Sequence, residues 1–119
     1  MAELARRFEL FGRAAQARRY ELAYFELDEI GEIFHDDLPR AIRPHDVDAE
    51  ILRTHRVSFA SSAIPALRNA TRAHDADAIA RAYAHAATIC NGCHLATQHA
   101  FIEVSPTLGA SVPRMDPLP

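Results

Sequence analysis

The amino-acid sequence predicts an all-α fold: an antiparallel four-helix bundle in a single domain over residues 1–119, with an irregular proline-rich tail over 105–119. Three observations support this prediction. Apolar residues recur every three or four positions in four successive segments, and polar or proline-containing stretches separate those segments. No alternation of apolar and polar residues is long enough for a sheet. A chain of 119 residues can bury one hydrophobic core without disulfides.

A tight turn is predicted between the first two helices. The first helix, over residues 2–18, has one apolar stripe: Leu4, Phe8, Phe11 and Ala15. A second stripe begins at Tyr20 in a different phase and continues to Leu38. We therefore expect a helix–helix connection around residues 18–20, with a single long bent helix as the alternative.

Prolines and aspartates delimit the third helix. Residues 36–46, DDLPRAIRPHD, are expected to break the second helix and form a loop across one end. Asp46 or Asp48 can cap the following helix, which should run to about His74 with a kink or restart near Pro65.

The fourth helix is expected to start at Asp75 or Asp77 and to end near Thr97. One face of this helix carries Ile79, Tyr83, Ala86, Cys90, Cys93 and Thr97. The FIEV segment that follows should be extended. The last 15 residues contain four of the seven prolines, and we expect this tail to wrap around the bundle.

Composition and charge exclude several classes of protein. The net charge of −3 argues against a general nucleic-acid binder, although all thirteen basic residues are arginine. No run of apolar residues is long enough to span a bilayer. Residues 1–19 carry five arginines, whereas residues 20–38 carry seven acidic residues and no arginine, which fits antiparallel neighbours.

The two cysteines form a motif with the residue that follows them. Cys90, Cys93 and His94 lie in the pentapeptide CNGCH. This Cys-x-x-Cys-His spacing is the attachment signature of c-type haem, in which two thiols form thioethers and the adjacent imidazole binds the iron. On a helix the three side chains share one side. The sequence therefore predicts one covalently attached haem c, with His94 as the metal ligand.

With CNGCH on its last helix, the chain resembles the four-helix-bundle c-type cytochromes, the cytochrome c′-like class, in a subgroup with an extended C-terminal tail. The preceding DADAIARAYAHAATI and the segment ARRYELAYFELDEI also carry the resemblance. It implies that Cys90 and Cys93 are the thioether positions and His94 the proximal ligand. It also implies that the first helix faces the distal side of the haem.

The resemblance places three phenylalanines, Phe8, Phe11 and Phe101, among the expected haem contacts. The first helix contains no His, Lys or internal Met, so we expect an apolar distal pocket with five-coordinate or weakly ligated iron. Other residues remain open as a sixth ligand: His35, His45, His55, His74, Met1 and Met115.

Two alternatives to haem follow from the same thiols. A zinc site would use Cys90, Cys93 and His94 with His99 or His85, but adjacent Cys93 and His94 do not easily occupy two tetrahedral positions. A redox dithiol of thioredoxin type needs a βαβ context that the sequence lacks.

The expected function is electron transfer with a redox partner protein or the binding of a small gas. No set of residues typical of a peroxide-cleaving pocket is recognisable, so an enzyme is not expected. Covalent c-haem is attached outside the bacterial cytoplasm, and the resemblance therefore implies a periplasmic protein whose export signal has been removed. Bundles of this class often dimerise through their first helices, so a homodimer is a candidate assembly.

Overall fold

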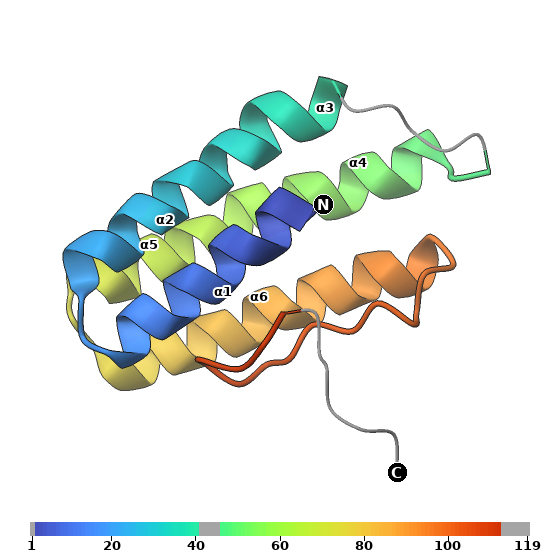
Figure 1. Cartoon of the computed structure of the whole chain (residues 1–119). Coiled ribbons are helices and arrows are strands. Elements are labelled where there is room, and N and C mark those ends of the chain that lie inside the picture. The colour runs from blue at the N-terminus through green and yellow to red at the C-terminus, as the bar shows by residue number, and fades with distance from the viewer. Residues whose placement is uncertain (1, 41–45, 113–119) are drawn as a thin grey trace, which may run out of the picture.

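Four long helical segments follow one another along the chain and reverse direction at each connection (Figure 1). The computed structural model describes residues 2–40 and 46–112, and within them every regular element is helical. The first segment is α1 (Ala2–Gln16), and the second is α2 (Tyr20–Glu32), continued by η1 (Ile33–Asp37) and α3 (Leu38–Arg40). The third is α4 (Ala49–Ser58), continued by η2 (Phe59–Ala63) and α5 (Ile64–Arg72), and the fourth is α6 (Ala76–Ala96). These segments form a compact globule with a radius of gyration of 13.9 Å.

The turn predicted around residues 18–20 is present, so the first two helices are separate. Arg18 takes a left-handed backbone with φ of +59°, and the amide of Arg19 donates to the carbonyl of Ala14. The turn before α6 repeats this geometry: His74 has φ of +54°, and the amide of Asp75 donates to the carbonyl of Ala70. Such bonds close the end of a helix. For this reason α1 ends at Gln16, two residues before its predicted end.

The prediction that residues 36–46 break the second helix is wrong for residues 36–40. Here the helix continues through Pro39, directly after the π-helical turn η1, in which the amide of Leu38 donates to the carbonyl of Ile33. The same arrangement precedes Pro65, where the amide of Ile64 donates to the carbonyl of Phe59. Proline clashes with the carbonyl four residues earlier in an α-helix. A wider turn relieves that clash and keeps the helix continuous.

Two helix starts follow the predicted caps. The Asp48 carboxylate accepts from the amides of Glu50 and Ile51 at the start of α4. The Asp75 carboxylate accepts from the amide of Ala78 at the start of α6.

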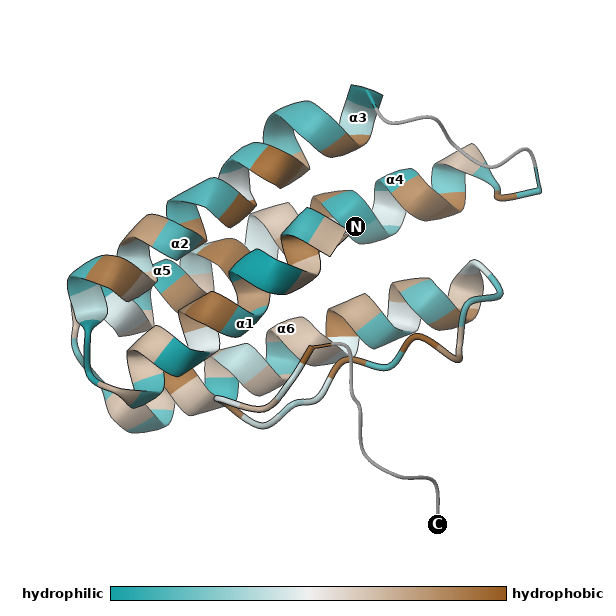
Figure 2. Ribbon diagram, viewed as in Figure 1, coloured by the Kyte–Doolittle hydropathy of each residue, from teal (hydrophilic) through white to brown (hydrophobic). Residues whose placement is uncertain are grey.

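The core is rich in aromatic side chains. Tyr83 of α6 stacks on Phe8 of α1 at a centroid distance of 4.3 Å, and Phe11 lies parallel to it at 6.2 Å. Phe34 of η1 stacks on Phe59 of η2 at 4.2 Å, which joins the second and third segments. Figure 2 shows hydrophobic and hydrophilic bands following one another along each helix, and the buried hydrophobic residues form this shared core.

An ion pair connects α1 with α2, as the opposite charges of these segments suggested. The guanidinium of Arg7 lies 3.1 Å from the carboxylate of Glu26, whose side chain is only 6% exposed. The same arginine also binds Glu3 at 2.8 Å. α1 makes its most extensive contacts with α2.

After α6 the chain turns back at Gln98, which has φ of +64°, and residues 97–112 return along α6 without regular structure (Figure 1). This return reaches α1, where a Cβ on Gly12 would lie 3.2 Å from the amide nitrogen of Gly109. A Cβ at position 12 would crowd this contact, and the neighbouring chain would have to shift by a few tenths of an ångström. Among the helices of the described residues, none is long and apolar enough to cross a membrane.

Candidate functional site

The three motif residues lie on the last turns of α6. Cys90, Cys93 and His94 are each partly exposed, and both cysteines are free. At 100° per residue, their side chains leave the helix within about 100° of one another. This is the same side as Ile79, Tyr83 and Ala86, which are buried in the core. Cys90 packs against that core cluster.

The imidazole of His94 is held by the returning chain. Its Nδ1 lies 2.8 Å from the carbonyl oxygen of Ile102. A carbonyl can only accept a hydrogen bond, so Nδ1 must donate, and neutral His94 then has its lone pair on Nε2. Metal-binding histidines commonly donate the hydrogen of their other ring nitrogen in this way, which fixes the ring orientation.

The pKa of His94 lies below its ordinary value of 6.5. The main cause is burial, which disfavours the charged imidazolium, and the nearby His99 lowers the pKa further. The hydrogen bond to Ile102 acts in the opposite direction. The lowered pKa favours the neutral ring, which is the form that binds a metal.

Both thiols are harder to ionise than free cysteine. Burial raises the pKa of Cys90 to about 12, and the neighbouring Cys93 adds to this shift. Burial also raises the pKa of Cys93. Near neutral pH both side chains are therefore thiols in this fold.

Asn91, between the two cysteines, binds the returning chain at two points. Its Nδ2 donates to the carbonyl of Val104 at 3.0 Å, and its Oδ1 accepts from the amide of Val104 at 2.7 Å. Sequence reasoning missed Asn91, Ile102 and Val104. Backbone groups of Ile102 and Val104 make these contacts, so no side-chain pattern could have revealed them.

The phenylalanines expected at the haem lie in different surroundings. Phe8 and Phe11 are buried and stack with Tyr83, which precedes Cys90 by two helical turns on the same face of α6. Phe101 is 82% exposed, and its nearest aromatic neighbour is the ring of His99 at 5.7 Å. The structure thus brings Phe8 and Phe11 to the inner side of α6 and leaves Phe101 at the surface.

One of the candidate sixth ligands reaches the motif helix. His55 of α4 has its Nε2 4.0 Å from the place that a Cβ on Gly92 would occupy. Gly92 lies about 200° around the helix from Cys90 and about 100° from Cys93, so His55 contacts α6 away from the side chain of Cys90. His35 is exposed beside Asp36, and His74 stacks on Tyr20. His45, Met1 and Met115 lie outside the described residues.

Packing around the motif is thinner than elsewhere. Residues 89–94 are all partly exposed, and α4, which packs against α6, has no fully buried residue. Ile51 of α4 and Leu95 of α6 are 38% and 68% exposed. Two thiols and an imidazole on one helix face, with Nε2 of His94 left as the ligating atom, are the set of side chains that a haem c requires.

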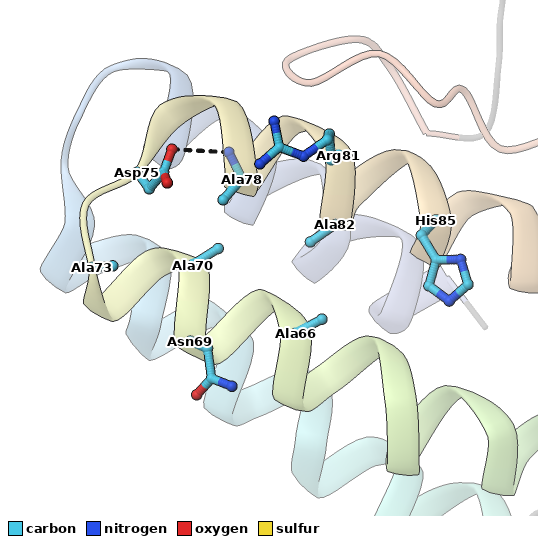
Figure 3. Close-up of a pocket in the computed structure, with 9 residues that line it drawn as sticks. All are labelled: Ala66, Asn69, Ala70, Ala73, Asp75, Ala78, Arg81, Ala82 and His85. Atoms are coloured by element: carbon cyan, nitrogen blue, oxygen red, sulfur yellow. Dashed lines mark hydrogen bonds between the residues drawn. The ribbon is translucent and has the colours of Figure 1, made fainter.

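Two cavities lie away from the motif. The first, of about 530 Å³, lies between α5 and α6, with a floor of alanines and with Asp75, Arg81 and His85 at its edge (Figure 3). The second, of about 590 Å³, lies between the second and third helical segments, beside Phe34 and Arg68.

No cluster of three or more His, Cys, Asp or Glu side chains that could hold a metal ion is found in the described part of the chain. In comparisons with known proteins, no protein-family model, curated protein or solved structure matches this chain.

Proposed function

We propose that this chain is a monohaem c-type cytochrome that acts in electron transfer, built as an antiparallel four-helix bundle of the cytochrome c′-like class. Cys90 and Cys93 would hold the haem through thioethers, and His94 would bind the iron through Nε2. When bound, the haem iron supplies one-electron redox chemistry and a site for a small gas. The observation that carries this proposal is the hydrogen bond from His94 Nδ1 to Ile102 within a Cys-x-x-Cys-His motif.

The protein surface supports a charged redox partner. Exposed carboxylates cluster on α2 and η1: Glu21, Asp28, Glu32, Asp36 and Asp37. Such a surface attracts a basic partner and accelerates its association at low ionic strength. Because haem is attached to c-type cytochromes outside the bacterial cytoplasm, the proposal includes a periplasmic location.

Binding of a small gas is the second candidate function, and the apolar character of α1 favours it. Leu4, Phe8 and Phe11 form its buried face towards the core. If α1 covers the distal side of the haem, these side chains provide no nitrogen or oxygen donor for the iron.

An absorption spectrum of protein produced with a haem-maturation system tests the proposal and separates the two functions. The dithionite-reduced protein is measured before and after carbon monoxide. Sharp low-spin bands that do not change when carbon monoxide is added support electron transfer. Broad high-spin bands that sharpen with the gas support gas binding. Colourless protein with two free thiols contradicts the haem proposal, and a zinc or redox-dithiol module then takes its place.

A further inference from the structure

Beyond the turn that ends α6, two residues of the following segment, Ile102 and Val104, are hydrogen-bonded to side chains of the motif helix. The chain reverses at Thr97 and Gln98, where the Thr97 hydroxyl donates to the carbonyl of Cys93 at 2.8 Å. Further along, Ile102 accepts from His94, and Val104 exchanges two hydrogen bonds with Asn91. We call residues 97–104 the strap.

The two ties belong to one register. The strap runs antiparallel to α6, so the later strap residue, Val104, meets the earlier helix residue, Asn91, while Ile102 meets His94. Asn91 and His94 are three residues apart on a helix, which makes them neighbours on the same face. Holding Val104 against Asn91 therefore also sets the position of the Ile102 carbonyl along the axis of α6, beside the imidazole of His94.

Asn91 binds both polar backbone groups of one residue. Its amide donates to the carbonyl and accepts from the N–H of Val104, as a neighbouring β-strand would. Between Thr97 and Ile102 the strap is held by local bonds, such as that from the Ile102 amide to the carbonyl of His99 at 2.9 Å. The His99 amide also donates to the carbonyl of His94 at 2.6 Å, which ties the beginning of the strap to α6, whereas the two Asn91 bonds tie its far end.

We propose that Asn91 is a positioning residue for the proximal ligand: by clamping the backbone of Val104, it holds the Ile102 carbonyl where it accepts from His94 Nδ1 and leaves Nε2 for the iron. Only the statement that Nε2 binds the iron rests on the proposed function. The residue between the two cysteines thus aligns the adjacent histidine through the strap.

The burial of Val104 offers another way to hold the strap, and the test must separate the two. Val104 is 5% exposed and belongs to the core cluster. Val104→Ala removes side-chain packing but keeps both backbone groups that Asn91 binds. Asn91→Ala removes the clamp and keeps Val104. Asn91→Asp keeps the oxygen that accepts from the Val104 amide and loses the nitrogen that donates to the Val104 carbonyl. Asn69→Ala, on the surface of α5, is the matched control.

The first readout uses protein without haem. Nitrogen-15 NMR of the His94 ring at pH 8 reports which nitrogen carries the hydrogen, and amide exchange reports the Val104 N–H. Parent, Asn69→Ala and Val104→Ala should keep the hydrogen on Nδ1. Asn91→Ala should populate the Nε2–H form and accelerate Val104 exchange at least about tenfold. Asn91→Asp should fall between the two.

The second readout uses the haem-loaded protein. In Asn91→Ala the iron–histidine stretching band of the reduced form should shift to lower frequency, because a less firmly held Nδ1–H makes the imidazole a weaker donor to iron. An unchanged ring tautomer and Val104 exchange in Asn91→Ala would overturn the proposal. If the tautomer changes as expected but the parent protein takes up no haem, the positioning role of Asn91 is supported and the proposed function is contradicted.

Discussion

The two ends of this helical globule are packed differently. At the end with the turns at Arg18 and His74, the rings of Phe8, Phe11 and Tyr83 are almost fully buried and stack on one another. Towards the other end, beyond the buried and stacked rings of Phe34 and Phe59, α4 buries no residue completely and residues 89–94 of α6 are all partly exposed. We refer to these regions as the closed end and the motif end.

The two ends thus differ in how completely their side chains are buried. Close packing is the rule inside proteins, and at the motif end Ile51 and Leu95 are 38% and 68% exposed. A covalently attached haem would supply the apolar surface that the motif end lacks, and four predictions test this reading.

The largest expected effect is the loss of covalent haem. Cys90 and Cys93 are the two cysteines of the chain, so Cys90→Ala with Cys93→Ala should abolish haem that survives denaturation. Each single variant should retain at most one thioether. Haem-stained denaturing gels measure this, and full staining of the double variant would contradict the account.

The second prediction concerns stability in protein without haem. Phe11→Ala at the closed end should lower the free energy of unfolding by about 3–5 kcal/mol, because Phe11 is fully buried. Ile51→Ala at the motif end should cost about 0.5 kcal/mol or less, because Ile51 is partly exposed. Urea unfolding measures both, and equal losses would remove the distinction between the two ends.

The third prediction is that haem attachment stabilises the motif end more than the closed end. Amide hydrogen exchange should slow about tenfold or more in α4 and in residues 89–96, because haem would cover these partly exposed segments. Residues of α2 should slow less. Uniform slowing over all helices would indicate general stabilisation without a local contact.

Near neutral pH the last effect is absent, because it is a pH dependence that appears only in alkaline solution, in protein without haem. The pKa of Cys90 is raised from 9.0 to about 12 by burial, so the unfolded chain loses this proton first. Stability from this group is present below about pH 9 and declines as pH rises from 9 towards 12. In thermal unfolding scans, Cys90→Ala should weaken the decline of the melting temperature with rising pH. A decline as steep in the variant as in the parent would mean that other groups cause it.

Helix positions were predictable because each depends on local signals. The apolar stripes, the Asp48 and Asp75 caps and the phase change at Tyr20 all correspond to observed features. The break expected at Pro39 failed because the rule assumes α-helical geometry, whereas η1 widens the turn directly before the proline.

The placement of Cys90, Cys93 and His94 on one side of a helix was also predictable, since spacing on a helix is local. The partners of the motif were not. Asn91 and Val104 are 13 residues apart, and the bond from His94 ends on the backbone of Ile102, which has no sequence signature. The exposure of Phe101 depends on how the strap returns, and that return is decided by tertiary contacts.

Covalent haem attachment is tested most directly by the intact mass of the protein after production with a haem-maturation system, measured under denaturing conditions. We expect a single species carrying one haem, with Cys90 and Cys93 both unreactive towards a thiol reagent. Protein of unmodified mass with two reactive thiols would contradict it.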